Sequence, residues 1–420
     1  MSMPALSVMF KTVSSMCNLD CAYCYFRESL EGGRKTKRID RGMLEKLVPE
    51  YLDYVSDTGE ASLGWQGGEP MLAGLDFFEW VVDLEARSAR PGMVLSNDIQ
   101  TNGILIDDTW ASFFEQYNFL VGVSLDGPEE IHDAVRKSRS GRGSFTRVMA
   151  GLDALRKRAV DLNILCVIGP HNVGDTDTIL DFFSREEFSH VQLMPAMDFQ
   201  AIEPTAPPSY LVSPDEYGEF LVRAFDAWYF GGLPRVSIRT FDSFLQSYLA
   251  GDSDLCIHGA NCDCGLVVEH DGEVFPCDFY IHPKYSLGNI STRSLRGMAT
   301  SKERAAFMGR KAPLPDTCQA CEWRRYCHGG CPRNRTSPAS QDFFCQGYKR
   351  LFAHADESFR DLARSITRRA RYFEVIGRLQ ANGNQPPGRN DPCPCGSGRK
   401  HKACCGNPSL DRSYLFQQPR

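Results

Sequence analysis

The chain of 420 residues lacks the features of several protein classes. It has no apolar run long enough to cross a bilayer. Its first residues, MSMPALSVMFK, contain neither a charged segment nor a long apolar stretch, so we expect no secretory signal. Basic residues are not in excess, because the formal net charge is -6, which argues against a nucleic-acid partner. We therefore expect a cytoplasmic globular protein with no membrane partner and roughly two or three domains.

Cysteine, by contrast, is abundant. Sixteen of the 17 cysteines lie in three clusters, within residues 17–24, 256–345 and 393–405. In a reducing compartment, clustered cysteines are typical of metal ligands rather than disulfides. The remaining one, Cys166 in LNILCVIG, is predicted to be a small core residue on a buried strand.

The first 200 residues alternate short apolar runs with amphipathic helical patterns. Six runs are predicted strands, at residues 5–11, 62–66, 98–102, 119–125, 162–168 and 190–194. Six βα units in series predict a parallel sheet with right-handed crossovers. A closed barrel needs about eight units, so we expect an α/β fold with a partial (β/α)6 TIM-like barrel. Its active site should lie at the carboxyl ends of the strands.

Composition also predicts where the domains begin and end. The periodic pattern stops near residue 200, before the Pro-rich segment FQAIEPTAPPSYLVSP, and a second linker, ANGNQPPGRNDP, lies further along. The predicted units are a barrel at 1–200, a linker and helical connection at 201–255, a cysteine-rich domain with a C-terminal helix at 256–380, and a small cysteine-rich tail at 386–410.

The first cysteine cluster is CNLDCAYC, a CxxxCxxC directly after the first predicted strand. Its three thiolates, Cys17, Cys21 and Cys24, can bind three irons of a [4Fe–4S] cubane and leave the fourth iron open for a small molecule. Closed structural sites normally take four protein ligands, so a zinc knuckle that lacks a ligand, or surface thiols, are the alternatives. The triplet resembles the signature of radical S-adenosylmethionine (SAM) enzymes, whose open iron chelates SAM.

Further motifs follow the next three predicted strands. They are WQGGEP (65–70), QTNG (100–103) and SLDG (124–127), and each alone is also typical of a plain turn. Arg136 suits a carboxylate because its guanidinium can bind two oxygens, although a surface helix charge is the alternative. The radical SAM resemblance implies SAM contacts at Tyr23, Gly68, Glu69, Ser124, Arg136 and Met197.

The middle cluster contains nine cysteines, and its second part has the spacing CxxCxxxxxCxxxC. This spacing resembles the SPASM domain, an auxiliary-cluster module of radical SAM peptide-modifying enzymes. The resemblance implies two [4Fe–4S] clusters, one held by Cys256, Cys262, Cys277 and Cys331, the other by Cys318, Cys321, Cys327 and Cys345. Cys264 is left over. Fully ligated clusters have no open iron, so we expect electron transfer there; two zinc sites remain an alternative.

The wider resemblance is to anaerobic sulfatase-maturating enzymes. It rests on CNLDCAYCYF, WQGGEP, QTNGILID, SLDGPEEIHDAVR, GEVFPCDFYIHPKYSLGNI and CEWRRYCHGGCPRNR, which span residues 5 to about 350. These enzymes oxidise a cysteine or serine of a sulfatase to Cα-formylglycine. The resemblance implies as partners an unfolded or nascent sulfatase with a C/S-x-P/A-x-R motif and a low-potential electron donor such as flavodoxin or ferredoxin.

The same resemblance implies a catalytic role for Asp278, in PCDFY. Asp278 would take the proton of the substrate thiol or hydroxyl while a SAM-derived radical removes a hydrogen from Cβ. A turn residue is the alternative for Asp278. Two other functions stay open at this point, namely a SPASM enzyme that modifies or crosslinks a ribosomally made peptide, and a non-catalytic zinc-binding adaptor.

The tail, NDPCPCGSGRKHKACCG, resembles the SEC-C zinc motif. Its CxCx8CC spacing, from Cys393, Cys395, Cys404 and Cys405, suits one tetrahedral Zn²⁺. So small a segment needs a metal to fold, and we expect a docking role for it. The predicted cofactors are therefore SAM, three [4Fe–4S] clusters and one Zn²⁺.

Overall fold

The computed structural model describes residues 6–24, 38–196, 211–230, 234, 236–263, 265–337, 339–381 and 385–407. Two residues discussed above, Met197 and Cys264, lie outside these ranges.

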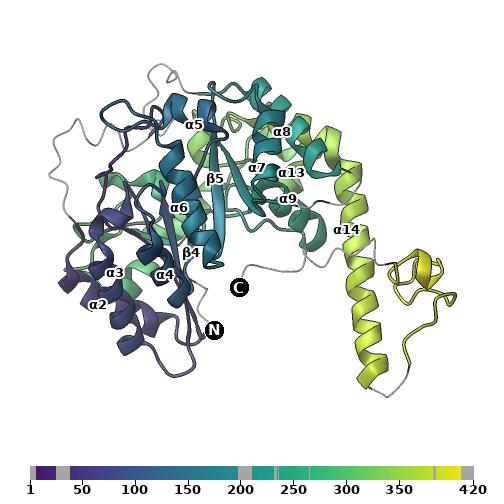
Figure 1. The fold of residues 1–420 in the computed structure, drawn as a ribbon, viewed down its shortest axis with the longest axis horizontal. Coiled ribbons are helices and arrows are strands. Elements are labelled where there is room, and N and C mark those ends of the chain that lie inside the picture. The colour runs from purple at the N-terminus through teal and green to yellow at the C-terminus, as the bar shows by residue number, and fades with distance from the viewer. Residues whose placement is uncertain are drawn as a thin grey trace.

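The described strands form one sheet in the order β10-β9-β8-β1-β2-β3-β4-β5-β6-β7 (Figure 1). Its centre is parallel and in sequence order. These central strands are β1 (Ser7–Lys11), β2 (Glu60–Gln66), β3 (Val94–Thr101), β4 (Leu120–Ser124), β5 (Leu162–Ile168) and β6 (His190–Pro195). All six predicted strands are present, and the predicted α/β fold with a partial barrel is confirmed.

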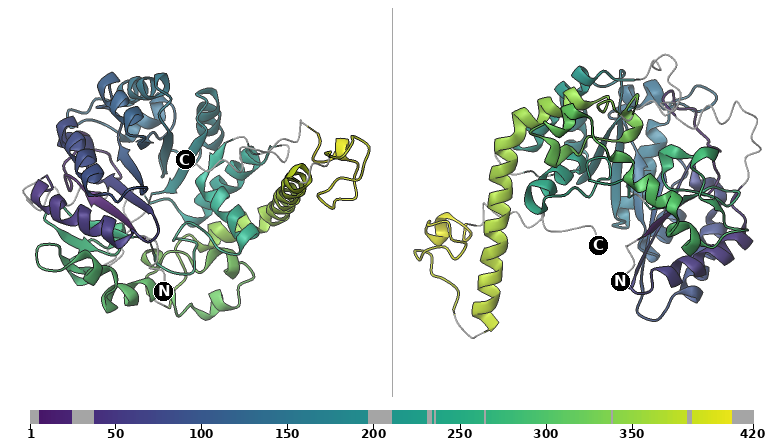
Figure 2. Two further views of the ribbon diagram at one scale, coloured as in Figure 1. Left: turned by 90° about the horizontal axis from the view of Figure 1, so that it is seen from below. Right: turned by 180° about the vertical axis from the view of Figure 1, so that it is seen from behind.

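Helices connect these strands and lie on the outside of the curved sheet (Figure 2). They are α2 (Arg41–Tyr54), α3 (Leu75–Ser88), α4 (Asp108–Gln116), α5 (Glu129–Val135), α6 (Phe145–Lys157) and α7 (Thr176–Arg185), with the 3-10 helix η1 (Pro70–Ala73) after β2. Aromatic rings fill the space between this layer and the sheet. The rings of Phe10 and Trp65 stack at 4.6 Å, and the edges of Phe77 and Phe78 meet Trp65.

Part of the inner face of the sheet, on β3 and β6, is accessible to solvent. Along β6, the outward-facing Val191 and Leu193 are buried, whereas the alternate residue Gln192 is only partly buried. On β3, Asp98 is exposed and Gln100 partly exposed, and both face inward. The interior of a closed barrel is filled by side chains. The inner face of this partial barrel therefore carries polar side chains that are at least partly exposed.

Short strands extend the sheet at both edges, and the sequence analysis missed them. They are β7 (Ser237–Ile238), β8 (Leu266–Val268), β9 (Glu273–Phe275) and β10 (Gly288–Asn289). Strand β8 pairs in parallel with β1, while β7 pairs in parallel with β6. Strands of two or three residues are too short to show an alternating pattern, but they satisfy backbone groups that an edge strand leaves unpaired. One sheet thus crosses the predicted boundary at residue 256.

The remaining helices belong to the second half of the chain. They are α8 (Pro214–Trp228), α9 (Arg239–Ala250), α10 (Leu295–Ala299), α11 (Lys302–Met308), α12 (Asp316–Gln319), α13 (Arg324–Cys327) and α14 (Cys345–Ala381), with 3-10 turns η3 (Asp278–Tyr280), η4 (Pro283–Tyr285), η5 (Gly309–Lys311), η6 (Pro332–Asn334) and η7 (His401–Ala403). Helix α8 begins with a capping box, in which the Ser213 side chain accepts a hydrogen bond from the Glu216 amide and the Glu216 side chain accepts one from the Ser213 amide.

Helix α14 is partly packed and partly free of the body. Its buried side chains end at Ile366, and within this part Phe359 lies 4.9 Å from Phe225 of α8. Beyond Ile366 the helix runs away from the sheet and leads to the tail (Figures 1 and 2).

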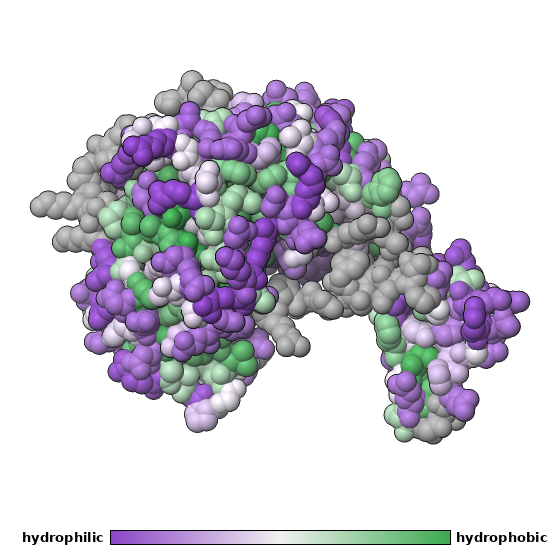
Figure 3. All heavy atoms as spheres, viewed as in Figure 1, coloured by the Kyte–Doolittle hydropathy of each residue, from purple (hydrophilic) through white to green (hydrophobic). Residues whose placement is uncertain are grey.

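The outer surface is mainly hydrophilic on the face shown in Figure 3, where hydrophobic residues occur in scattered groups. Of the helices within the described ranges, none combines the length and the apolar character that crossing a membrane requires.

Candidate active site

The three-cysteine loop, residues 12–24, follows β1 at the carboxyl edge of the sheet. N–H groups point at two of its sulfurs. The Leu19 amide lies 3.4 Å from the Cys17 Sγ and the Asn102 side-chain amide 3.6 Å from it, while the Arg136 guanidinium lies 3.9 Å from the Cys21 Sγ. Burial raises the pKa of Cys17 and of Cys21 to about 11. Such thiols become thiolates when a cation replaces the proton, and the donors stabilise that charge.

The GGE segment, residues 67–69, is bound directly to the loop. The Glu69 amide donates to the Met16 carbonyl at 2.8 Å. Gly68 has φ +53°, and a Cβ on it would lie 2.1 Å from that same carbonyl oxygen. Only glycine therefore fits at this position, and the close approach fixes the segment against the loop.

The Glu69 side chain is fully buried, and it accepts hydrogen bonds from its own chain. The donors are the Thr101 hydroxyl at 2.8 Å, the Asn102 amide at 2.8 Å and the Met71 amide at 3.1 Å. Burial raises the pKa of Glu69 to about 7, against the effect of these bonds. The carboxylate thus joins the GGE segment to QTNG. The SAM contact predicted for Glu69 stays a prediction.

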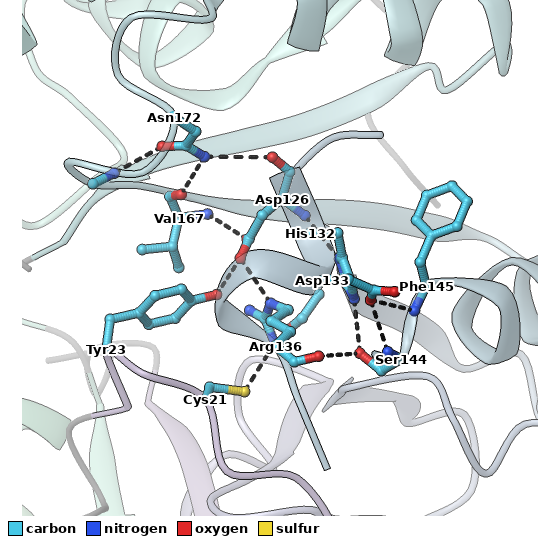
Figure 4. Close-up of polar contacts among 12 residues, drawn as sticks. Cys21, Tyr23, Asp126, His132, Asp133, Arg136, Ser144, Phe145, Val167 and Asn172 are labelled. Carbon is cyan, nitrogen blue, oxygen red and sulfur yellow. Dashed lines mark hydrogen bonds and ion pairs between the residues drawn. The ribbon is translucent and has the colours of Figure 1, made fainter. Parts of the chain in front are cut away.

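The buried residues Arg136 and Asp126 form a polar cluster with the partly buried Tyr23 (Figure 4). Arg136 Nε donates to Asp126 Oδ2 at 2.9 Å, and the Tyr23 hydroxyl donates to the same oxygen. The guanidinium also lies over the Tyr23 ring, 5.3 Å from its centre. Burial alone would raise the pKa of Asp126, but Arg136 holds it below its ordinary value. Arg136 is therefore part of an internal ion pair rather than a surface helix charge.

His132 connects this cluster to the next helix. Burial and the charge of Arg136 lower the pKa of His132 to about 4, so the ring is neutral at pH 7. Its Nδ1 accepts from the Asp126 amide at 3.3 Å, which leaves Nε2 to donate to the Ser144 hydroxyl at 2.9 Å. That hydroxyl in turn donates to the Arg136 carbonyl at 2.7 Å (Figure 4).

Two residues of these motifs were missed in the sequence. Asp126 lies in SLDG, two positions after the predicted contact Ser124, and an acidic residue at a strand end could have drawn attention to it. Gln100 lies in QTNG, and its side-chain amide donates to the Ser124 hydroxyl at 3.2 Å. The structure brings Tyr23, Gly68, Glu69, Ser124 and Arg136 to one edge of the sheet, and their contacts with SAM stay a prediction.

Asp278 lies in an ion pair with a lysine of the barrel. Its Oδ1 contacts the Nζ of Lys11, the last residue of β1. The Lys11 side chain is 0% exposed and that of Asp278 14% exposed. Lys11 was missed in the sequence, where the signal was a lysine at the end of a largely apolar strand.

The auxiliary cysteines fall into two groups. Burial is the main cause that raises the pKa of Cys262 to about 11, and the nearby Cys256 and Cys277 contribute. Burial likewise raises the pKa of Cys331 to about 12, with a contribution from Cys277. In the second group, Cys318, Cys321, Cys327 and Cys345 line a single pocket between α12, α13 and the start of α14. The two groups have the same members as the two predicted ligand sets.

The tail gathers four thiols. Ligand atoms of Cys393, Cys395, Cys404 and Cys405 all lie within 4.8 Å of one another. At about 2.3 Å per Zn–S bond, sulfurs on a tetrahedral zinc lie about 3.8 Å apart, close to the 3.5 Å between Cys395 and Cys404. The Tyr372 hydroxyl lies 2.9 Å from His401 Nε2 and so attaches the tail to α14.

Models of known families match three parts of the chain. The radical SAM superfamily matches residues 12–183, the SPASM iron-sulfur cluster-binding domain matches 261–322, and the SEC-C motif matches 389–407.

Two groups of relatives are similar to this chain over most of their length. A cysteine-type anaerobic sulfatase-maturating enzyme of Clostridium perfringens (strain 13 / Type A) is 36% identical over 373 residues, 87% of this chain and 100% of the relative. A serine-type enzyme of Bacteroides thetaiotaomicron is 33% identical over 371 residues, 83% of this chain and 89% of the relative.

Solved structures agree with these relatives. Native anSMEcpe with bound AdoMet and the Cp18Cys peptide superposes with a TM-score of 0.80 at 35% identity, over 86% of this chain and 100% of that one. Streptococcus suis SuiB bound to S-adenosylmethionine has a TM-score of 0.57 at 14% identity, over 82% of this chain and 78% of that one, which is a likeness of fold.

Proposed function

The chain belongs to the family of anaerobic sulfatase-maturating enzymes, and from this premise we propose that it oxidises a cysteine or serine side chain of a sulfatase to Cα-formylglycine. The contact between Asp278 and Lys11 supports the proposal most, because the cysteine loop begins directly after Lys11. The predicted proton acceptor thus contacts the residue that precedes the cysteine loop, although Asp278 and Lys11 are 267 positions apart in the sequence.

The residues at hand fit the cofactors that the family implies. Cys17, Cys21 and Cys24 would hold the open cluster, and the N–H donors at two of the sulfurs suit thiolate ligands. The two auxiliary groups would each hold one further [4Fe–4S] cluster, and the tail one Zn²⁺, whose spacing the four thiols meet. When bound, the open cluster and SAM supply the radical that removes a hydrogen from the substrate Cβ.

The chain's own residues would bind the substrate, accept its proton and hold the cysteine loop. The open inner face of the sheet, with Asp98 and Gln100, would receive the substrate polypeptide. The Asp278 carboxylate would accept the proton from the substrate thiol or hydroxyl. The cluster of Arg136, Asp126 and Tyr23 would hold the cysteine loop in place, because Arg136 bonds both Asp126 and Cys21. An external low-potential donor such as flavodoxin or ferredoxin would deliver electrons.

The test is anaerobic incubation of reconstituted protein with SAM, a reductant and a C/S-x-P/A-x-R peptide, read by mass. Relatives of both types exist, so both peptides are used. A cysteine peptide should exchange its sulfur for oxygen and lose two hydrogens, while a serine peptide should lose two hydrogens only. Absence of both changes, with SAM cleaved, contradicts the proposal.

Asp278→Asn sharpens this test. The variant should cleave SAM yet lose formylglycine formation by a factor on the order of 10² to 10⁴, the usual contribution of a general base. Asp271→Asn is a matched control, because Asp271 is an exposed turn residue before β9. Formylglycine at the wild-type rate in Asp278→Asn contradicts the assignment.

A further inference from the structure

The ion pair between Lys11 and Asp278 is buried and joins two parts of the chain. Lys11 ends β1 of the barrel, whereas Asp278 begins η3 in the cysteine-rich region. Taking an ammonium group out of water is costly unless its charge is paired. With its side chain 0% exposed, Lys11 meets this condition through Asp278.

The surroundings of Lys11 fix the direction of its side chain. Its neighbour Phe10 stacks on Trp65 at the outer face, so the alternation of the strand turns Lys11 to the inner face. There the lysine stem crosses Gly67, where φ is +102° and an added Cβ would lie 2.7 Å from Lys11 Cδ. Gly67 therefore leaves the space that the lysine occupies.

We propose that Lys11 is a positioning residue that fixes the Asp278 carboxylate relative to the cysteine loop and the GGE segment. The inference rests on the proposed function, in which Asp278 accepts the substrate proton. Lys11 belongs to the barrel frame at two points, since its carbonyl accepts from the Ser14 amide at 3.2 Å and its side chain packs on Gly67. Its contact with Asp278 extends that frame to a residue of the other region.

Position matters here because the two events of the reaction occur on neighbouring atoms. A hydrogen leaves Cβ, and a proton leaves the sulfur or oxygen bonded to it. A proton acceptor works only within hydrogen-bond reach, about 2.6–3.2 Å, and a displacement of about 1 Å can cost on the order of a hundredfold in rate. An acceptor carried by one region and a radical site carried by another therefore need a direct link, and Lys11 provides it.

A purely structural role makes a different prediction, and Lys46 supplies the matched control. Lys46 of α2 also joins the barrel to the cysteine-rich region, because its Nζ donates to the Ile290 carbonyl. Lys46→Met removes a second lysine contact between the two regions, from an exposed side chain to a backbone carbonyl, without touching Asp278. If Lys11 served only to hold the regions together, the two methionine variants would behave alike.

The experiment compares wild type, Lys11→Met, Lys46→Met, Asp278→Asn and the double variant Lys11→Met/Asp278→Asn. Reconstituted proteins receive SAM, reductant and a peptide deuterated at the target Cβ. The readouts are deuterium in 5′-deoxyadenosine, formylglycine, and the thermal midpoint of each protein before reconstitution. We expect Lys11→Met to take up deuterium like wild type but to form formylglycine roughly ten- to a hundredfold more slowly. The double variant should be no slower than Asp278→Asn alone.

Each outcome decides between the possibilities. Formylglycine formation by Lys11→Met at the wild-type rate overturns the proposal, as does a double variant slower than Asp278→Asn. Equal losses in Lys11→Met and Lys46→Met also overturn it. If Lys11→Met does not bind iron, Lys11→Gln is measured instead, since it keeps a donor on a similar stem, and the same criteria apply. A wild type that forms no formylglycine contradicts the proposed function, whereas a normal wild type with a normal Lys11→Met contradicts only the role of Lys11.

Discussion

The three-cysteine loop of the barrel and the four-cysteine tail bring thiols together in different ways. In the loop, the backbone is bonded to distant parts of the chain. The Asp20 amide donates to the Lys137 carbonyl at 2.7 Å, and the Ala22 amide donates to the Val135 carbonyl at 3.0 Å. In the tail, bonds run within the segment, as from the Cys393 amide to the Arg399 carbonyl at 2.8 Å.

This difference teaches where each site obtains its stability. The backbone of the loop is held by the sheet, by the GGE segment and by the chain after α5. The described tail residues have little core of their own, and they meet α14 through Tyr372 and His401. The candidate active site is thus held by the barrel, whereas we expect the tail to need a metal ion to stay folded.

The largest expected effect is the loss of zinc from the tail. Cys404→Ser should abolish the protection of the tail amides, because structural zinc contributes about 10–16 kcal/mol to the folding of comparable segments. Hydrogen exchange measures this at the Cys393 and His401 amides, which donate within the tail. The amides of Asp20 and Ala22 are the internal control and should not change. Protected tail amides in a zinc-free variant would remove the contrast between the two regions.

Breaking the buried ion pair between Asp126 and Arg136 should lower the stability of the barrel but not that of the tail. Asp126→Asn leaves Arg136 buried without its counterion, and we expect a loss of about 3–5 kcal/mol in the free energy of unfolding. Denaturant unfolding of the barrel measures the change. Asp108→Asn is the control, because it breaks only an exposed ion pair with Arg158 and should leave the transition in place. A similar loss of unfolding free energy in Asp126→Asn and Asp108→Asn would show that the polar cluster does not stabilise the cysteine loop.

The stability of the barrel should also vary with pH through Glu85. Burial raises the pKa of Glu85 from 4.5 to about 7, although Asn97 donates to it at 2.8 Å. The folded protein therefore holds this proton more tightly than the unfolded chain, and stability falls as pH rises from about 4.5 to about 7. Glu85→Gln should lack this loss, which amounts to about 3 kcal/mol.

Denaturant unfolding of wild type and Glu85→Gln below pH ~5 and above pH ~7 measures this difference. Because Glu85 lies on α3 of the barrel, hydrogen exchange in the tail should be the same in both proteins. A stability difference that does not change with pH would contradict the assignment of the titration to Glu85.

The smallest expected effect concerns the link between tail and helix. Tyr372→Phe removes the hydroxyl that bonds His401 but keeps the ring contact at 5.4 Å. The loss of one hydrogen bond costs about 1 kcal/mol, so amides of α14 near residue 372 should exchange about fivefold faster. Phe373→Leu is the control, since Phe373 is an exposed neighbour on the same helix. An equal increase in amide exchange in both variants would mean that His401 does not attach the tail to α14.

Local patterns were enough to predict much of the fold. Hydrophobic residues recur with a clear period in the six parallel strands and in the long helices α8 and α14. Their sequences therefore predict their secondary structure. The spacing of the three cysteines in the loop and of the four in the tail is also a local property, so a metal site could be predicted at each. The two auxiliary ligand sets came from the family resemblance and stay a prediction. Their assignment to particular metals, the roles of the SAM-contact residues and the predicted domain boundaries remain predictions.

Only the tertiary structure decided the rest. Strands β7–β10 form because the edges of the barrel offer unpaired backbone groups, not because their own residues alternate. The pairing of Asp126 with Tyr23, and of Lys11 with Asp278, joins residues that are 103 and 267 positions apart. A charged side chain can be buried in a protein only when an opposite charge pairs with it. Here the partner comes from a distant part of the chain, so no local pattern in the sequence predicts the pair.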